Sequence, residues 1–341
     1  MTVKPPTLRI KVLDVGEGDA IVVLLPDTRR AFIVDAYDGE KVLGVLESEA
    51  VDEAVIFASH SDDDHVAGLE HLVASFGGRF AAYFYNPDRL DRCKRYLSLL
   101  RLLSKNTRAS AMAWGSNFNT SLNYDSRFAN LVPDSVILQV LHPNHSEQMS
   151  LLGTSTNEVS GVLRVGMACP GDEVHAVMLT GDVQLTGISC MLHRTKPEHL
   201  KADVLKFPHH GAWPTGYPGI SQFAGMKRAS MQAFLEAVSP RAVILSVGFD
   251  NQHGHVNPAV FDALVKLERY SGRPVRTLCT EFTRTCTGAL SNGASRVCAG
   301  DIEIRIGPTV PGNLEILPAA GEHSIARERA QTPQCTTCSD G

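Results

Sequence analysis

The chain of 341 residues carries 32 Lys and Arg against 37 Asp and Glu, a formal net charge of -5, with 43% hydrophobic and 20% charged residues. This composition excludes disordered, collagen-like and fibrous proteins and is typical of a globular one. A chain of this length forms a core without disulfides or structural metals. Because no apolar run approaches the roughly 20 residues of a membrane span, and residues 1–6 lack a signal peptide's apolar stretch, we expect a cytoplasmic protein.

Short apolar runs separated by Gly- and Asp-bearing turns predict strands over residues 8–13, 20–25, 31–34, 55–58, 136–141, 161–165, 176–179, 204–207 and 242–247. Apolar residues at helical spacing predict helices after His65 and over residues 184–192, 231–238 and 258–267. The elements interleave without a low-complexity linker, which predicts one mixed α/β domain over residues 1–310. Residues 311–341 lose this periodicity and are expected to form a loosely ordered tail.

Residues 88–108 carry seven basic and two acidic side chains in an otherwise acidic chain. One interpretation is a basic edge that steers a polyanion toward the protein. The other is an ordinary amphipathic helix, because leucines recur at helical spacing and charges fill the opposite face. We favour the amphipathic helix, since charged outer faces are usual for surface helices.

The most informative stretch follows the apolar run 55–58 and reads Ser59-His60-Ser61-Asp62-Asp63-Asp64-His65. Alternate side chains of an extended segment face one way, so His60, Asp62 and Asp64 can converge, while His65 enters from the turn into a helix. Neighbouring carboxylates repel one another unless a cation lies between them. An acidic helix start is the alternative, but it does not explain the two histidines. The stretch therefore predicts a metal site.

Three further apolar runs also end on residue types that bind metals. They lead into Thr180-Gly181-Asp182, Pro208-His209-His210-Gly211 and Asn251-Gln252-His253-Gly254-His255. Each alone is weak, because a strand-terminal Asp is usually a turn former and a lone His is usually a hydrogen-bonded residue. Sheets bring the loops at one edge side by side, so four such loops in one chain predict a shared site.

The order of these segments resembles the metallo-β-lactamase-fold hydrolases, and most of all the soluble hydrolase domains of ComEC-type DNA-uptake proteins. The segments that carry the resemblance are Leu13 to Ala20, Ile33 to Asp35, Ser59 to His65, Asn157 to Leu163, Leu179 to Asp182, Leu205 to Gly211, and Ser246 to Gly248 with Gly254-His255. They run in order from about Leu8 to Ile306. The resemblance implies a four-layer αββα sandwich of the α/β class, with a two-metal site where the loops of two sheets meet.

Carried onto this chain, the resemblance implies ligands for two divalent cations. His60 and Asp62 would hold one cation and Asp64 and His65 the other, with Asp182 bridging them. The metallo-β-lactamase signature usually has histidine where Asp62 stands, and the oxygen ligand shifts the preference from Zn²⁺ toward Mn²⁺ or Mg²⁺.

The last two motifs would complete these sites. His255 would finish the second, and either His209 or His210 the first. Asp14 and Asp35 would orient loops and hydrogen-bond the ligands without touching metal. ComEC-like domains also tend to have Ser where this chain has Ala212 and Pro where it has Val256, so a hydroxyl contact at Ala212 is lost.

The remaining expectations concern catalysis and substrate contacts. Asp64 would hold a metal-bound hydroxide in line, and His210, if it binds no metal, would protonate the leaving alkoxide. Lys206 is a candidate phosphate contact, the alternative being a strand-end lysine that reaches solvent. Asn157 lies where relatives with a third histidine motif carry a ligand; its role is open, and we include it among candidate substrate contacts.

The resemblance supplies the substrate class, because composition and spacing reach only as far as metal-assisted hydrolysis. It implies a phosphodiester hydrolase, a nuclease acting on nucleic acid or nucleotide phosphodiesters. One alternative keeps the metals but gives the site a cyclic nucleotide or an ester. Another is a metal-bound regulatory or scaffold subunit that works beside protein partners, as in a defence system; no residue identifies a partner.

Five of the eight cysteines fall at or after Cys279: Cys279, Cys286, Cys298, Cys335 and Cys338. They could supply an additional structural Zn²⁺ that pins the tail to the body. Buried free thiols are the alternative, because the first three match no standard zinc spacing. A disulfide among them is less compatible with a cytoplasmic protein.

Overall fold

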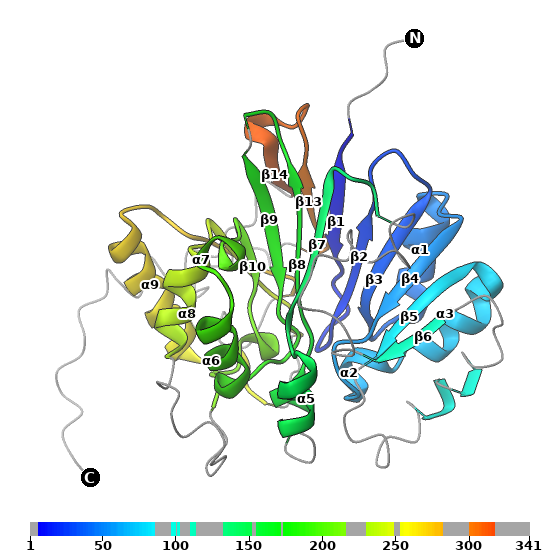
Figure 1. The fold of residues 1–341 in the computed structure, drawn as a ribbon, viewed down its shortest axis with the longest axis horizontal. Coiled ribbons are helices and arrows are strands. Elements are labelled where there is room, and N and C mark those ends of the chain that lie inside the picture. Colours follow the sequence, from blue (N-terminus) through cyan, green and yellow to red (C-terminus); the bar gives the residue numbers. More distant parts are fainter. Residues whose placement is uncertain are drawn as a thin grey trace, which may run out of the picture.

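A computed structural model describes residues 6–85, 97–99, 101–102, 110–113, 132–151, 155–171, 173–215, 230–248, 253–281 and 300–317. Two β-sheets form its centre (Figure 1). The first has the order β14-β13-β1-β2-β3-β4-β5-β6, with bounds Leu314–Leu317, Ile302–Ile306, Leu8–Val12, Ala20–Leu24, Arg30–Ala36, Glu53–Phe57, Phe80–Tyr85 and Ser110–Ala113. The second has the order β12-β11-β10-β9-β8-β7, with bounds Arg276–Cys279, Ala242–Leu245, Val204–Lys206, Val174–Leu179, Val162–Ala168 and Val136–His142.

Alternation along the strands explains why the two sheets pack face to face. In β2, Ile21 and Val23 point into the apolar cluster between the sheets, whereas Val22 and Leu24 point to the outer face. In β9, Val177 likewise faces the other sheet. Successive side chains of a strand face opposite sides, so both faces of each sheet are apolar and both need a cover.

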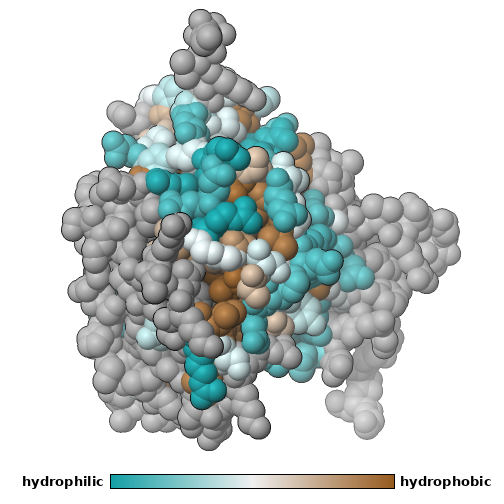
Figure 2. All heavy atoms as spheres, turned by 90° about the vertical axis from the view of Figure 1, so that its right-hand side faces the viewer, coloured by the Kyte–Doolittle hydropathy of each residue, from teal (hydrophilic) through white to brown (hydrophobic). Residues whose placement is uncertain are grey.

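Helices provide that cover on both outer faces, which completes a four-layer αββα arrangement (Figure 1). The first sheet is covered by α1 (Gly39–Ser48) and α3 (Leu69–Phe76). The second is covered by α6 (Leu185–Arg194), α7 (Pro197–Leu200), α8 (Met231–Val238) and α9 (Pro258–Ser271). Figure 2 shows the side that carries α1 and α3, where hydrophilic residues surround a smaller hydrophobic area.

The parallel strands end at the same edge of the sandwich. In the first sheet β3 and β4 run parallel, and in the second β9, β10 and β11 do. Asp35 lies at the carboxyl end of β3, and Ser59, Asp182, His209 and Ser246 follow the ends of β4, β9, β10 and β11. The short helices α2 (Asp63–Val66) and α5 (His145–Leu151) lie at this edge too (Figure 1). The topology thus gathers the motifs that the sequence singles out.

The strands and helices expected within the described residues are present with small shifts in their ends, and the expected fold class is confirmed. The structure adds elements that the sequence did not indicate, among them α1, β5 and β12. It also differs from the expected tail. Residues of β14, which fall after Pro311, pair with β13 in register Ile316 to Ile304, and Ile316 is buried in the core between the sheets. Residues 318–341 and most of the basic segment 88–108 lie outside the described residues.

Within the described ranges, no helix has both the length and the apolar character that crossing a membrane requires.

Candidate metal centre

The loop after β4 places His60 and His65 in the interior. The backbone N–H and the hydroxyl of Ser59 both donate to Asp35, at 2.7 Å each, which ties the end of β4 to the end of β3. Asp62 then precedes α2, a single turn that carries His65 inward, and both imidazoles are fully buried. Asp62 and Asp64 stay partly exposed at the mouth of the site.

Asp182, at the end of β9, lies between two groups of side chains. Its Oδ1 is 3.1 Å from Nε2 of His65 and 3.6 Å from Nε2 of His210, which in turn is 3.3 Å from Oδ2 of Asp64. The ligand atoms of Asp64, His65, Asp182 and His210 all lie within 4.8 Å of one another. We call Asp64, His65 and His210 the Oδ1 group.

The other oxygen of Asp182 faces a second group. Oδ2 is 3.9 Å from Nε2 of His60 and 3.6 Å from Nε2 of His209. Nε2 of His60 is also 3.4 Å from Oδ2 of Asp62, which accepts a hydrogen bond from the Thr156 hydroxyl at 3.0 Å. We call His60, Asp62 and His209 the Oδ2 group. The Asp182 carboxylate lies between these two groups, which differ from the sets expected from the sequence in having His210, and not His255, beside Asp64 and His65.

The partners of the Nδ1 atoms assign the tautomers of the buried histidines. Nδ1 of His210 donates to the carbonyl oxygen of Ser246 at 3.0 Å, and Nδ1 of His65 donates to Asp35 at 2.8 Å. Nδ1 of His60 lies 3.0 Å from the Ser59 hydroxyl, which already donates its own proton to Asp35. In the neutral forms, Nε2 of all three therefore presents a lone pair to the site.

His209 has the opposite tautomer. The backbone N–H of Thr215 donates to Oε1 of Gln184 at 2.7 Å, which turns Nε2 of that amide toward Nδ1 of His209 at 2.8 Å. Nδ1 of His209 therefore accepts, and its Nε2 carries the hydrogen in the neutral ring. His209 offers the site an N–H donor, whereas His210 offers a lone pair.

This set of donors fits a bound cation. Lone pairs of His65 and His210 face carboxylate oxygens of Asp64 and Asp182, and acceptors at such distances repel unless a cation or proton lies between them. Nε2 of His60 and Oδ1 of Asp182 are buried and make no hydrogen bond within the described part of the chain. Imidazole and carboxylate are ligands of Zn²⁺, Mn²⁺ and Mg²⁺.

The charged side chains of the centre shift one another's pKa toward the ionised forms even without a metal. Burial would lower the pKa of His65, but the carboxylates of Asp182 and Asp35 raise it well above its ordinary value. Burial would raise the pKa of Asp182, but His65 and His210 hold it well below its ordinary value. Since Asp182 is ionised at neutral pH, the protein presents the anionic form that binds cations.

Asp19 and Lys206 form a buried ion pair behind the histidines. Lys206 is fully buried, its ammonium group contacts the Asp19 carboxylate, and Asp19 is itself 3.8 Å from Nδ1 of both His65 and His210. Burial would raise the pKa of Asp19, but Lys206 and the two histidines hold it below its ordinary value. Lys206 is therefore not the strand-end lysine reaching solvent that the alternative expected, and its contact with a phosphate stays a prediction.

Three residues of the site have left-handed backbone conformations that favour glycine. The φ angles are 56° at Asp35, 50° at His209 and 51° at His210. Each such conformation costs a residue with a side chain on the order of 1 kcal/mol or more. The hydrogen bonds of these side chains hold them in place, as described above for Asp35 and His210.

Other residues named from the sequence lie apart from the group within 4.8 Å. The His255 ring centre is 5.8 Å from that of His209 and 6.5 Å from that of His210, and burial beside these rings lowers the pKa of His255 to about 4. Asn157 accepts a hydrogen bond from Thr156, the residue that contacts Asp62. Asp14 lies where Lys41 contacts its carbonyl oxygen, away from the centre.

Cys279 is buried in β12 among apolar residues. The other cysteines proposed for a structural Zn²⁺, Cys286, Cys298, Cys335 and Cys338, lie outside the described residues, so that site stays a prediction.

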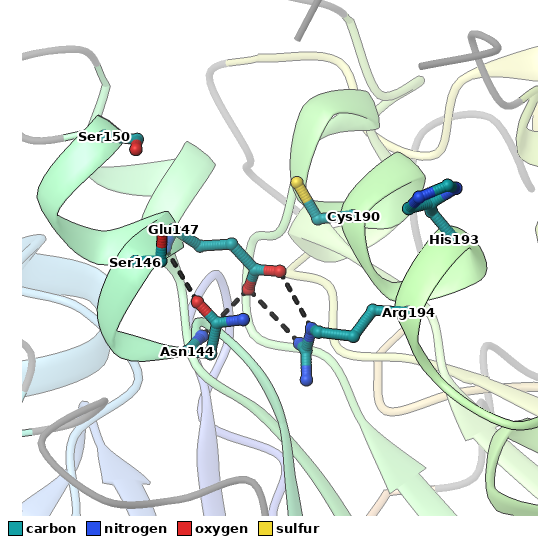
Figure 3. Close-up of a pocket in the computed structure, with 7 residues that line it drawn as sticks. All are labelled: Asn144, Ser146, Glu147, Ser150, Cys190, His193 and Arg194. Carbon is teal, nitrogen blue, oxygen red and sulfur yellow. Dashed lines mark hydrogen bonds and ion pairs between the residues drawn. The ribbon is translucent and has the colours of Figure 1, made fainter. Parts of the chain in front are cut away.

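A pocket of about 430 Å³ lies between α5 and α6 (Figure 3). Glu147 and Arg194 line it and form an ion pair at 2.9 Å, and Glu147 also contacts Nδ1 of His142 at 3.1 Å. Nε2 of His142 donates to the carbonyl oxygen of Glu158 at 2.8 Å. Glu158 belongs to the short helix Thr156–Val159, so this network supports the residue that holds Asp62.

Some residues of the centre could not be picked out from the sequence. The hydroxyl oxygen of Ser160 accepts a hydrogen bond from the backbone N–H of Asp182 at 2.9 Å. Gln184 orients His209, and Asp19 neutralises Lys206. Asp19 stands in the segment Gly16-Glu17-Gly18-Asp19, whose place in the resemblance was the one signal available for it.

No family model matches the chain. Among curated proteins it is similar to ComE operon protein 3 of Bacillus subtilis (strain 168), with 23% identity over 291 residues. This stretch covers 79% of the chain and 31% of that protein, so the chain spans less than a third of its relative's length.

The chain is also similar in fold to three solved structures. The metallo-β-lactamase fold protein YhfI from Bacillus subtilis has a TM-score of 0.45 at 12% identity, covering 79% of this chain and 96% of YhfI. A long form RNase Z from yeast has a TM-score of 0.40 at 10% identity, covering 72% and 37%. The metallo-β-lactamase MIM-1 from Novosphingobium pentaromativorans has a TM-score of 0.32 at 12% identity, covering 67% and 86%. The resemblance read from the sequence is confirmed by the curated relative and by the αββα arrangement: this chain resembles metallo-β-lactamase-fold proteins.

Proposed function

We propose that the chain is a divalent-metal-dependent phosphodiester hydrolase that acts on nucleic acid. The observation that carries the proposal is the Asp182 carboxylate, whose two oxygens face two different groups of imidazoles and carboxylates at 3.1–3.9 Å. A carboxylate in this position suits a pair of cations. Two bound cations would lower the pKa of a water molecule and neutralise the charge that builds up on a phosphodiester during displacement.

The tautomers and charges of the residues give them different roles in this proposal. His65 and His210, with Asp64 and Asp182, form the stronger candidate site, because all four ligand atoms converge within 4.8 Å. His60 and Asp62 supply the second position, with Oδ2 of Asp182. Asp62 and Asp64 make both positions rich in oxygen, which favours Mn²⁺ or Mg²⁺ over Zn²⁺.

His209 has a different role in this proposal. Its Nε2–H points toward the site and is fixed there by Gln184, so it donates a hydrogen bond to an anionic oxygen of the substrate. Burial lowers the pKa of His209, which keeps the ring neutral at pH 7. A neutral imidazole that donates stabilises charge without transferring a proton. The sequence left open which of the two histidines binds metal and made His210 the candidate acid only if it binds none. In this proposal His210 binds metal and His209 is the hydrogen-bond donor.

The test combines metal analysis with a substrate panel. Purified protein loaded with Mn²⁺, Mg²⁺ or Zn²⁺ is assayed on plasmid DNA, single-stranded DNA and RNA, a cyclic nucleotide and an ester. The proposal predicts two bound cations per chain and hydrolysis of a nucleic acid. Hydrolysis of the ester or the cyclic nucleotide alone would establish a small substrate. Two bound cations with no hydrolysis of any substrate would favour a scaffold or regulatory protein.

A further inference from the structure

Three large hydrophobic side chains are well exposed in the described part of the chain: Tyr37 at 39%, Val174 at 41% and Tyr270 at 68%. Val174 begins β9, at the end opposite Asp182, and Tyr270 lies near the end of α9. Tyr37 alone of the three adjoins the metal centre. It follows Asp35 by two residues, and its backbone N–H donates to the carbonyl oxygen of Asp19 at 2.9 Å.

The position of the Tyr37 ring is set by Gly18. A Cβ atom on Gly18 would lie 2.5 Å from Cγ of Tyr37 and 2.7 Å from the carbonyl oxygen of Asp64. The ring therefore packs on bare backbone, beside a residue of the Oδ1 group. The backbone N–H of Asp19 also donates to that Asp64 carbonyl at 3.0 Å, which holds the two segments together. The result is a partly exposed aromatic ring held against Gly18, next to the backbone of Asp64.

An exposed aromatic ring beside a phosphodiester site can contact a nucleobase of the substrate. Nucleobases stack on aromatic side chains, and each stack contributes to affinity with little dependence on sequence. Bases inside a duplex are already stacked and paired, so a protein ring reaches them most easily in single strands and at ends. An ester or a phosphodiester without a base would leave the ring unused.

We propose that Tyr37 stacks on an unpaired nucleobase next to the phosphodiester that is cleaved, which makes single-stranded nucleic acid the preferred substrate. This inference rests on the proposed function. The shared chemistry is a base joined to a phosphodiester, so a cyclic nucleotide would use the same ring. An oligonucleotide and a 3′,5′-cyclic nucleotide therefore form separate arms of the test.

The test compares an oligothymidylate with an abasic strand of the same length and charge. Hydrolysis by the Mn²⁺-loaded wild type, Tyr37→Ala, Tyr37→Phe and Tyr270→Ala gives KM and kcat for each strand. We expect Tyr37→Ala to raise KM for oligothymidylate by about tenfold, with kcat changed little, and to abolish the preference over the abasic strand. Tyr37→Phe should keep that preference, and so should Tyr270→Ala, which removes an equally large exposed ring far from the site.

The inference is overturned if Tyr37→Ala changes KM for both strands equally or for neither. A binding measurement tests the inference independently of catalysis. The affinity for labelled strands, measured by fluorescence anisotropy in Ca²⁺, should show the same loss of base preference in Tyr37→Ala. If the wild type hydrolyses no nucleotide, the proposed function fails, while the anisotropy still decides whether the ring binds a base. A loss confined to the cyclic nucleotide would contradict the single-strand preference.

Discussion

The ammonium group of Lys206 lies on the carboxylate of Asp19, and this ion pair is buried directly behind His65 and His210. The two members come from opposite sheets, Asp19 just before β2 and Lys206 at the end of β10. The pair thus joins the sheets at the point where the candidate ligands meet. It also supplies a fixed positive charge close to a cluster rich in carboxylates.

Removing one member should therefore destabilise the fold. Lys206→Met leaves Asp19 as a buried charge without its cation, and we expect the free energy of unfolding to fall by about 3–5 kcal/mol. Lys206→Met combined with Asp19→Asn removes both charges and should recover much of that loss. Urea unfolding followed by circular dichroism measures both. If the single variant loses less than about 1 kcal/mol, the pair does not act as described.

Asp182 lies between the Oδ1 and Oδ2 groups and faces both of them. Asp182→Ala should therefore abolish hydrolysis and lower the number of bound cations. Asp64→Ala should abolish hydrolysis too, because Asp64 belongs to the Oδ1 group. The fold should persist in both variants, since both residues lie at the loop edge of the sandwich and not in its apolar clusters. Activity assays, metal analysis and circular dichroism provide the three readouts. Full activity of either variant at unchanged metal content contradicts the two-metal proposal.

The choice of metal should depend on Asp62. The wild type should be more active with Mn²⁺ than with Zn²⁺, and Asp62→His should shift that preference toward Zn²⁺ because imidazole is the softer ligand. Titration of activity and of binding with each metal measures the shift. Asp62→Asn serves as the matched control, because it removes the charge without adding a nitrogen ligand of the imidazole type. A wild type that works best with Zn²⁺ and is inhibited by Mn²⁺ would refute the argument.

Glu147 should make stability depend on pH. Burial opposes its ionisation, but the hydrogen bond from His142 and the charge of Arg194 lower its pKa from 4.5 to about 2. A depressed carboxyl pKa stabilises the folded state above about pH 4.5, and this contribution disappears as pH falls toward 2. Glu147→Gln should therefore be less stable than the wild type at pH 7, with a difference that narrows between pH 5 and pH 2.

Unfolding by guanidinium at several pH values tests this expectation. Glu303→Gln is a useful comparison, because Glu303 is also held ionised, by Arg9 and Arg305, but lies on β13 far from the pocket. Both variants should show the same pH trend, and Glu147→Gln alone should also weaken hydrolysis, through the helix that carries Thr156. A pH-independent difference for Glu147→Gln would show that the ion pair does not titrate as described.

The sequence predicted the strands because their apolar runs are short and bounded by turn residues, as in β2 and β4. It predicted the gathering of the ligands because a parallel sheet brings its carboxyl ends to one edge. The pairing of β14 with β13 was not predictable in this way. Its four residues include Glu315 among apolar neighbours and follow a proline and a glycine, so the local pattern was that of a loop.

The different roles of His209 and His210 could not be predicted from the sequence, for another reason. The two residues are adjacent and chemically identical, and their roles differ only through partners brought from elsewhere in the chain. Gln184 donates to one and the Ser246 carbonyl accepts from the other. Likewise, nothing in the sequence around Lys206 reveals that its partner is Asp19, 187 positions earlier.

The left-handed backbone at His209 carries a conformational cost, and the ring of His209 is partly exposed. Glycine adopts such angles freely, so a chain selected for stability alone would replace this residue. His209→Gly should give a protein that resists heat as well as or better than the wild type, provided that the lost contact with Gln184 is small. The imidazole of His209 is thus retained at a cost in stability, and a laboratory selection for thermostability without selection for activity should lose this residue of the centre first.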